Sequence, residues 1–402
     1  MQRLNWIVSV RKESVMKYID TERVVIKSWC NNPEENALAQ ARNLANLPFV
    51  FRQVCLMPDT HEGYGMPIGG VIATQGAVIP NAVGVDIGCG MLALQTSLRE
   101  IDLSALKRVV GTMRKTIPVG FDHHKEPQDE SLMPPLDDPA RYPEVSRQYR
   151  SACKQLGTLG GGNHFIEVQK GSDGHIWFMI HSGSRNLGLK VASRHNRIAV
   201  DLNEQWHVAV PKKWELAFLP LETEEASTYL REMRYCLDFA LANRQLMASR
   251  VRDAFRNEIP EVTFGEAINI HHNYASLENH FGQDVLVHRK GATSARDGEP
   301  GIIPGSQGTA SYIVRGKGNP DSFMSCSHGA GRKMGRQAAI RNLDLESEKK
   351  ALDEKGILHA LRGKKDLEEA AGAYKDIDVV MEEQRDLVDI IVRLEPLAVI
   401  KG

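Results

Sequence analysis

The glycine-rich segment Gly84–Met91 places a carboxylate and a thiol three residues apart, at Asp86 and Cys89. Glycine permits positive φ values and close backbone approach, so such a turn can direct both side chains at one ion. Carboxylates and thiolates are both ligands for divalent metals. By itself, the segment also fits a tight turn with a buried cysteine and a capping aspartate.

Histidines occur in comparable settings further along the chain. The segments that carry them are Gly160–Glu167, His181–Arg185, His271–Tyr274 and Ser325–Arg332. Neighbouring side chains on a strand face opposite sides, so only one of His271 and His272 can serve a given site. His328 has small neighbours, which leave room for a bulky ligand. Each of these histidines, taken singly, fits an ordinary core or surface residue equally well, so the argument for a site rests on their combination.

Several common catalytic patterns are missing from the sequence. It contains no GxxxxGK[ST] string, no C-x-x-C pair, no H-E-x-x-H helix and no GxSxG elbow. The lysine motif K-x-D-G of common nucleotidyl-transfer ligases is also missing, because Lys170–Gly174 has the wrong spacing. The loop Pro304–Thr309 can offer backbone N–H groups and hydroxyls to a phosphate.

The composition is that of a globular protein with a large core. The 402 residues are 42% hydrophobic and 25% charged, with a net charge of -1. Apolar runs stay below the roughly 18 residues of a membrane span, and Met1–Trp6 lacks the apolar stretch of a signal peptide. Six scattered cysteines indicate free thiols in a reducing compartment, so we expect a cytoplasmic protein without a membrane partner.

Positive charge is concentrated in residues 285–341. Nine basic residues minus three acidic residues give this segment a charge of about +6. Such a segment suits a polyanion such as RNA. The alternative, a solvated basic face balanced by acidic helices elsewhere, is favoured by charge alone.

The elements expected around these segments form an α+β protein. Short apolar runs predict strands at 71–72, 77–79, 91–94, 176–180 and 285–287, whereas 223–257 and most of 343–394 have helical spacing. Strands and helices do not alternate regularly, which argues against a doubly wound sheet. Residues 121–148 are polar and predict a surface excursion, in which His123 and His124 are interpreted as solvated.

Taken together and in this order, the glycine- and histidine-bearing segments resemble the signatures of the RtcB family of RNA-splicing ligases, with a closer likeness to its bacterial branch. The resemblance runs from about Met57 to Gly402, with gaps at the polar excursion and the central helical region. The matching strings are Val83–Met91, Gly162–Phe165, His181–Arg185, His271–Tyr274, Ile303–Ser306 and Ser327–Arg332. The family likeness implies one domain over residues 1–402, with mixed or antiparallel sheets around a metal- and nucleotide-binding cleft and helices outside.

The resemblance also implies roles for individual residues. Cys89 would bridge two manganese ions, with Asp86 and His164 completing one and His181 and His272 the other. His328 would be the catalytic nucleophile. The residues implied to contact GTP are Asn163, Glu167, His272, Asn273, Pro304, Gly305, Ser306, His328, Gly329, Ala330, Gly331, Tyr374 and Lys401. Arg185 and Arg332 would meet RNA or phosphate. The ligand types leave the metal open, since zinc binds such a set at least as tightly as manganese.

The implied activity is GTP-dependent joining of RNA 2′,3′-cyclic-phosphate or 3′-phosphate ends to 5′-hydroxyl ends through a guanylylated histidine. Archease is a candidate activating partner. Two alternatives remain open from the residues. A two-metal phosphoesterase or nuclease would use the same ligands without needing His328, Asn163 or Lys401. A non-catalytic RNA-end-binding protein would need the basic segment but tolerate the loss of Cys89. The role of Cys326, two residues before His328, is also open; an inert packing residue and a reactive thiol both fit.

Overall fold

A computed structural model describes residues 16–402 of the 402-residue chain, so the segment Met1–Trp6 lies outside the described residues. The α helices are α1 (Glu35–Ala45), α2 (Pro80–Val83), α3 (Leu103–Thr116), α4 (Pro143–Gln155), α5 (Arg185–Gln205), α6 (Glu224–Glu258), α7 (Arg336–Asn342), α8 (Leu345–Glu354) and α9 (Ile377–Glu383). Short 3-10 helices cover Glu130–Leu132, Pro139–Arg141, Lys212–Trp214, Pro320–Ser322, Lys364–Glu369 and Ala371–Ala373.

The strands are β1 (Lys17–Ile19), β2 (Val25–Ser28), β3 (Val50–His61), β4 (Ile68–Thr74), β5 (Ala77–Val78), β6 (Gly90–Gln95), β7 (Phe165–Gly171), β8 (Ile176–Ser182), β9 (Leu219–Pro220), β10 (Ile268–His271), β11 (Asn273–His280), β12 (Gln283–Lys290), β13 (Ala292–Ser294), β14 (Pro300–Ile303), β15 (Ser311–Gly316), β16 (Ser325–Ser327) and β17 (Val388–Lys401). The strands expected from short apolar runs lie in β4, β5, β6, β8 and β12, although Ile79 falls just beyond β5.

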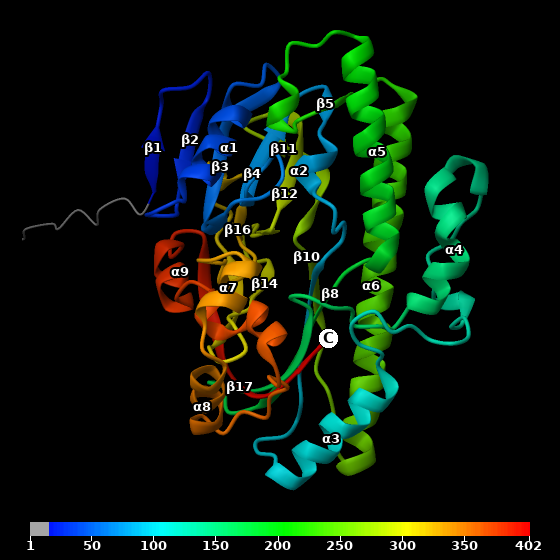
Figure 1. The fold of residues 1–402 in the computed structure, drawn as a ribbon, viewed down its shortest axis with the longest axis vertical. Coiled ribbons are helices and arrows are strands. Elements are labelled where there is room, and N and C mark those ends of the chain that lie inside the picture. Colours follow the sequence, from blue (N-terminus) through cyan, green and yellow to red (C-terminus); the bar gives the residue numbers. More distant parts are fainter. Residues whose placement is uncertain (1–15) are drawn as a thin grey trace, which may run out of the picture.

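Two sheets organise the described chain (Figure 1). One has the order β1-β2-β3-β4-β12-β11, and the other β10-β6-β8-β7-β17-β15-β14. Neighbours in both sheets are antiparallel except for β2 and β3, which run parallel. The expected α+β class with mixed sheets is confirmed.

The two sheets meet at one residue that belongs to neither. β10 forms an edge of the seven-stranded sheet and β11 an edge of the six-stranded sheet, and only His272 separates them in sequence. The His272 backbone N–H donates to the Cys89 carbonyl at 2.9 Å, and His271 pairs with Gly90 across β10 and β6. Segments from distant parts of the sequence therefore converge at this junction.

Helices cover the seven-stranded sheet on one face. α3 and the long α6 pack there on buried side chains of β6, β7 and β8, with Phe178 at the centre of the contact with Phe255. The expected helix at 223–257 is confirmed as α6, and Thr223 caps it by accepting a bond from the Ala226 N–H at 3.2 Å. The opposite face packs on α8 through Leu352.

The C-terminal segment differs from the expectation of helix over most of 343–394. α8 and α9 are helical, but Val388–Lys401 is a long strand between β7 and β15. Val392, Leu394 and Pro396 are buried, whereas Arg393 and Glu395 between them are exposed. This alternation has the period of a strand. The helix expected over most of 343–394 is therefore wrong from Val388 onward, where the chain joins the seven-stranded sheet instead.

The polar excursion is only partly an irregular surface segment. Its last residues start α4, whose first N–H groups at Glu144 and Val145 donate to the buried Glu232 carboxylate of α6 at 2.6 and 2.8 Å. Figure 1 shows α4 on the outer side of α6. His123 is exposed as expected, but His124 accepts a bond from Arg250 at 2.9 Å.

All six cysteines are free and buried. Among residues 16–402, each helix is either too short or insufficiently apolar to cross a membrane.

Candidate metal and nucleotide site

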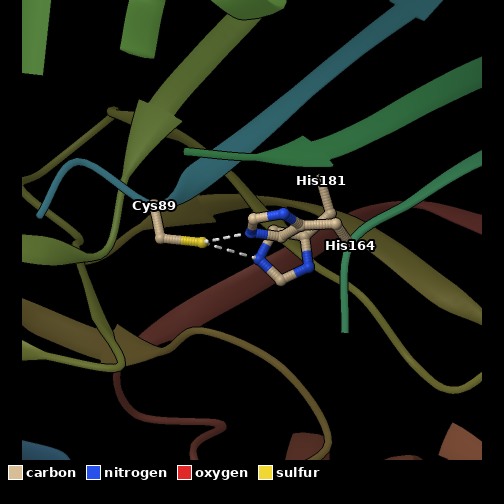
Figure 2. A group of neighbouring side chains, drawn as sticks. All are labelled: Cys89, His164 and His181. Atoms are coloured by element: carbon tan, nitrogen blue, oxygen red, sulfur yellow. Dashed lines mark hydrogen bonds between the residues drawn. The ribbon is translucent and has the colours of Figure 1, made fainter. Parts of the chain in front are cut away.

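Three buried side chains converge on one point at the junction of the sheets (Figure 2). Cys89 Sγ lies 3.2 Å from His181 Nε2 and 3.3 Å from His164 Nε2. Cys89 directly precedes β6, His164 directly precedes β7, and His181 lies near the end of β8. Because these three strands are neighbours in one sheet, their ends bring the three ligand atoms together.

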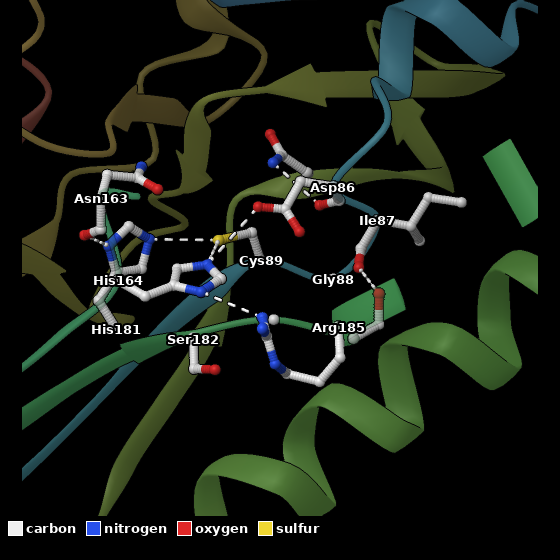
Figure 3. A network of polar contacts seen from close by, with 12 residues as sticks. Asp86, Ile87, Gly88, Cys89, Asn163, His164, His181, Ser182 and Arg185 are labelled. Carbon is white, nitrogen blue, oxygen red and sulfur yellow. Dashed lines mark hydrogen bonds and ion pairs between the residues drawn. The ribbon is translucent and has the colours of Figure 1, made fainter. Parts of the chain in front are cut away.

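Asp86 and His272 complete the set expected from the sequence. Asp86 Oδ2 lies 3.6 Å from His164 Nε2, and His272 Nε2 lies 3.4 Å from His181 Nε2. Figure 3 shows Asp86 and Cys89 on the same turn, both directed toward the two histidines. We call Asp86, Cys89, His164, His181 and His272 the ligand cluster. Of the two adjacent histidines, His272 faces this cluster, while His271 contacts Gly88 and Arg244.

Backbone carbonyls orient two imidazoles of the ligand cluster. His164 Nδ1 lies 3.0 Å from the Leu159 carbonyl, and His181 Nδ1 lies 3.0 Å from the Asn163 carbonyl. An Nδ1–H donated to a carbonyl leaves the Nε2 lone pair free to bind a metal. Both free Nε2 atoms then face Cys89. His272 Nδ1 is buried without a hydrogen-bond partner, so its ring is fixed by packing against His181 and His328 instead.

The protonation states fit a cation-binding centre. Burial, followed by the charge of neighbouring histidines, lowers the pKa values of His181 and His272 far below the usual range, so both rings are neutral. Burial raises the pKa of the Cys89 thiol, with the Asp86 charge as a second cause. Burial also acts to raise the pKa of Asp86, but the His164 contact, the Arg185 charge and the Cys89 contact together outweigh burial and lower the pKa to about 2. One thiol, three imidazoles and a carboxylate supply ligands suited to divalent transition metals, and a bound cation favours the thiolate.

His328 stands next to the ligand cluster and is held by a residue to which the sequence assigned no role. The His328 and His272 rings lie 4.8 Å apart. Asp59 Oδ2 accepts from His328 Nδ1 at 2.6 Å, from the His328 backbone N–H at 3.0 Å and from the Gly329 N–H at 3.2 Å. The Asp59 side chain is fully buried. Its three hydrogen bonds fix both the ring and the backbone of His328, and they leave His328 Nε2 free. A sequence signal that could have indicated Asp59 is its place in the segment Met57–Gly65, which contains several polar residues and two glycines.

The loops on either side of His328 depend on close backbone packing. Gly331 has a φ of +72°, and a Cβ atom there would lie 2.2 Å from the Asp59 carbonyl oxygen. Gly329 lies against Pro304 from the neighbouring loop, and Ala330 is buried. In that loop the Ser306 N–H donates to Thr309 Oγ1 at 2.7 Å, and the Gly305 N–H donates to Ser311 Oγ at 3.2 Å. The structure thus brings the residues 304–306 and 328–331, which were expected to contact a nucleotide, next to each other.

Glu167 and Lys401 lie on one face of the paired strands β7 and β17. The register aligns Lys401 with Phe165 and Val399 with Glu167, which places the two charged residues diagonally across the pair. Burial raises the pKa of Glu167 to about 8, against the opposing effect of the Lys401 charge. Gln169 Nε2 donates to Glu167 Oε2 at 2.7 Å. The C-terminal residues are therefore docked through a strand rather than a frayed tail.

Glu369 is the central acceptor beside Lys401, and nothing in the sequence indicated it. Lys401 Nζ lies 3.5 Å from Glu369 Oε2, while Arg332 Nη1 and Arg336 Nε lie 3.2 and 3.3 Å from Glu369 Oε1. The Tyr374 hydroxyl donates to Glu369 Oε2, and Arg332 stacks on the Tyr374 ring. We call these five residues the Glu369 network. Burial acts to raise the pKa of Glu369, but the surrounding cations, Lys401 first, lower it.

The two arginines expected to meet RNA or phosphate have protein partners. Arg332 belongs to the Glu369 network, and its Nη2 also donates to the Glu368 carbonyl at 2.5 Å. Arg185 begins α5 with a φ of +60°, and its Nη1 lies 3.2 Å from His164 Nδ1 (Figure 3). Asn163 is placed beside both His164 and His181. Asn273 uses its amide to join the Asp86 carbonyl and the Gly291 N–H at 3.0 and 2.7 Å.

Part of the charge in the basic segment 285–341 is buried and paired internally, whereas Arg315, Lys333 and Arg341 are exposed. Arg289 is fully buried and binds Glu278 with both terminal nitrogens, and Arg296 pairs with the same carboxylate at 2.9 Å. Lys290 is buried and donates to the Tyr64 and Asn81 carbonyls. Cys326 is buried, and burial raises the pKa of its thiol, which fits a packing residue.

The fold and the ligand cluster define a protein with a buried group of side chains at the junction of two sheets that could hold a metal ion. A family model for the tRNA-splicing ligase RtcB matches residues 40–402. The chain is 38% identical to the RNA-splicing ligase RtcB of Escherichia coli K12, over 96% of this chain and 99% of that protein. It is 33% identical to the RNA-splicing ligase RtcB of Mycobacterium tuberculosis, over 90% and 100%, and 32% identical to the tRNA-splicing ligase RtcB of Thermococcus kodakarensis, over 92% of each. The chain belongs to the RtcB family, which confirms the resemblance found in the sequence.

Proposed function

We propose that this RNA ligase joins RNA 3′-phosphate or 2′,3′-cyclic-phosphate ends to 5′-hydroxyl ends, using GTP and two manganese ions. The observation that carries the proposal is the position of His328, which lies beside the ligand cluster with Nδ1 held by Asp59 and Nε2 free. A metal-binding set alone serves many hydrolases. An oriented imidazole next to that set is what a nucleotidyl transfer to histidine requires.

The ligand cluster would hold the metal ions, with Cys89 between Asp86 and His164 on one side and His181 and His272 on the other. Bound divalent ions would offset negative charge on phosphate oxygens. The residues around His328 have different tasks. Asp59 keeps the Nδ1 proton in place, and the small residues Gly329, Ala330 and Gly331 leave space beside the ring for a nucleotide.

The proposed reaction begins with opening of a cyclic phosphate end to a 3′-phosphate by water. His328 Nε2 then attacks the α-phosphorus of GTP, forming a P–N bond and releasing pyrophosphate. The RNA 3′-phosphate takes GMP from the histidine, which regenerates the free imidazole. Attack by the 5′-hydroxyl of the second strand forms the new phosphodiester and releases GMP. Covalent catalysis of this kind replaces one difficult joining step with several easier transfers.

The guanylate is proposed to lie between the loops at 304–306 and 328–331 and the paired strands β7 and β17. Ser306, Glu167 and Lys401 offer a hydroxyl, a carboxyl and an ammonium group from this side. Asn163, Asn273 and Tyr374 are kept as guanylate contacts in the proposal, together with His272. Arg185 and Arg332 remain the proposed phosphate contacts, although each must exchange or share its present partners to reach RNA.

The proposal also covers the domain organisation, location, partner and substrates of the enzyme. We propose that residues 1–402 act as one ligase domain, because the ligand cluster lies at the junction of the two sheets, and that the enzyme is cytoplasmic. Archease is proposed as an activating partner. The substrates are RNA ends of the type made by tRNA intron removal or by RNA damage; DNA ends of the same chemistry are a further candidate.

One experiment separates the ligase from its alternatives. The purified protein is incubated with GTP labelled at the α-phosphate, with and without manganese, and the denatured chain is tested for bound label. We expect manganese-dependent, acid-labile label on wild type and none on His328→Ala, which should retain its metal. Label on His328→Ala at the wild-type level would contradict the assigned nucleophile. Metal-dependent RNA-end hydrolysis without label, even with archease present, would favour the phosphoesterase.

A further inference from the structure

The strand that carries Asp59 loses its regular pairing at that residue. β3 pairs with β2 up to Leu56, and its ladder with β4 is interrupted between Leu56 and His61. Asp59 lies inside this interruption. A strand segment without regular partners leaves backbone carbonyls that need other donors. The position of Asp59, and through it that of His328, therefore depends on what satisfies these carbonyls.

Lys375 supplies the donors. Its Nζ donates to the Thr60 carbonyl at 2.6 Å and to the Pro58 carbonyl at 3.1 Å, on either side of Asp59. A third contact, at 3.6 Å, reaches Cys30 Sγ. An ammonium group has three donors, and the three contacts use them all. One partly buried lysine thus takes the place of a neighbouring strand at the point where β3 is irregular.

The backbone N–H of Lys375 bonds to the loop that follows His328. Its N–H donates to the Gly331 carbonyl at 2.9 Å, and Gly331 is the residue whose missing side chain allows close approach to Asp59. Lys375 therefore joins the strand that holds Asp59 to the loop that follows His328. The ammonium also places a positive charge near the fully buried Asp59 carboxylate, in addition to the one that His328 can carry.

We propose that Lys375 is a positioning residue for histidine guanylylation, which acts by fixing the Asp59 segment of β3 against the His328 loop. The inference rests on the proposed function, because it assumes His328 as the nucleophile. Among the interactions of the described residues, the Lys375 side chain contacts no member of the ligand cluster or of the Glu369 network, although Tyr374 precedes it in the chain. Its removal should therefore affect the rate of transfer rather than the binding of metal or GTP.

The test compares Lys375→Met, Lys375→Arg and wild type in single-turnover guanylylation with labelled GTP. Methionine keeps the length and loses the donors, whereas the arginine fork can still reach two carbonyls. We expect the maximal rate of Lys375→Met to fall by about 10- to 100-fold, with a half-saturating GTP concentration within about threefold of wild type. Lys375→Arg should recover to within about fivefold of the wild-type rate. Bound metal, measured by elemental analysis, should be unchanged in both variants.

Two matched variants control for loss of a lysine and of the thiol contact. Lys317→Met removes another lysine that donates to a backbone carbonyl, that of Arg385 at 2.7 Å, and should guanylylate like wild type. Cys30→Ser changes the third contact of Lys375 while leaving both carbonyl bonds, and should also be active. The inference would be overturned if Lys375→Met kept the wild-type maximal rate. It would also be overturned if only the half-saturating GTP concentration changed.

A crystal structure of Lys375→Met tests the same point without GTP chemistry. We expect the separation of Asp59 Oδ2 and His328 Nδ1 to increase from 2.6 Å, or the His328 ring to adopt a second orientation. An unchanged geometry would overturn the inference. A failure of the proposed function can be told apart from this outcome, because in that case the wild-type protein itself would take no label from GTP.

Discussion

The ligand cluster and the Glu369 network lie in one molecule but are built in different ways. In the ligand cluster, every side chain except that of His272 comes from a short glycine-rich segment, and neighbouring backbone carbonyls orient two of the rings. In the Glu369 network, one buried carboxylate from a 3-10 helix gathers cations from a loop, from α7 and from the chain end. The first arrangement is fixed locally by strand ends. The second depends on charge balance among residues far apart in sequence.

The difference has a functional meaning. A centre that binds metal needs ligand atoms at fixed positions, and rigid strand ends provide them. A surface that receives a nucleotide needs charged groups that can exchange partners, because the nucleotide brings phosphates of its own. Arg332 and Lys401 are held by Glu369 in the structure and are also the residues proposed to meet phosphate and guanylate. We infer that Glu369 keeps these cations in place until substrate arrives.

The largest expected effect comes from breaking the ligand cluster. Cys89→Ala removes the sulfur that both His164 and His181 face, so bound metal should be lost and guanylylation should fall about a thousandfold or more, equivalent to ~4 kcal/mol. Elemental analysis and the labelled-GTP assay measure the two effects. Cys153→Ala, a buried cysteine outside the cluster, is the control and should keep its metal. Full metal content in Cys89→Ala would show that this thiol is not a ligand.

A smaller effect is expected from breaking the Glu369 network. Glu369→Gln leaves Arg332, Arg336 and Lys401 without their carboxylate, which should lower the free energy of unfolding by about 2 kcal/mol. Part exposure of Arg336 keeps the loss below that of a fully buried pair. The half-saturating GTP concentration should rise about tenfold while bound metal is unchanged. Urea unfolding measures the change in the free energy of unfolding, and GTP titration measures the change in the half-saturating GTP concentration.

Glu368→Gln is the matched control for this prediction, because Glu368 contributes only its backbone carbonyl to Arg332. It should resemble wild type in both measurements. If Glu369→Gln lost metal as well as GTP affinity, the two regions would be coupled, and the contrast between them would be wrong.

The smallest expected effect concerns the protonation of Glu167. Burial raises its pKa to about 8, above the unfolded value of about 4.3. The folded protein therefore binds this proton more tightly than the unfolded chain does, and the associated stability is complete below about pH 4.3 and is lost as pH rises toward 8. Glu167→Gln cannot titrate, so wild type should become less stable relative to this variant as pH rises from 5 to 8.

Urea unfolding of the metal-free proteins at several pH values measures this difference, since the pH dependence of metal binding then drops out of the comparison. Parallel stability curves for wild type and Glu167→Gln would contradict the raised pKa. A loss that appeared only below pH 5 would indicate instead an ionised Glu167 held by Lys401.

The sequence by itself predicted the ligand cluster, the central helix and the membership in the RtcB family. Asp86 and Cys89 share one turn, and the resemblance to the RtcB family grouped them with His164, His181 and His272 before the fold was known. α6 was predicted because its apolar stripe is long and its first turn is acidic. Local spacing carries this information because turns and helices are decided mainly by nearby residues.

Only the tertiary structure decided the supports of the site. Asp59, Lys375 and Glu369 have no distinctive spacing, and their importance arises from partners up to 345 residues away. The strand β17 was mistaken for helix because its alternation is short and its stability comes from pairing with β7 and β15. The resemblance had already selected His272 over His271, and the structure supplies the reason, because His272 lies where the two sheets meet. Burial, strand pairing and the balance of buried charge are properties of the folded chain, so they became visible only when distant segments were brought together.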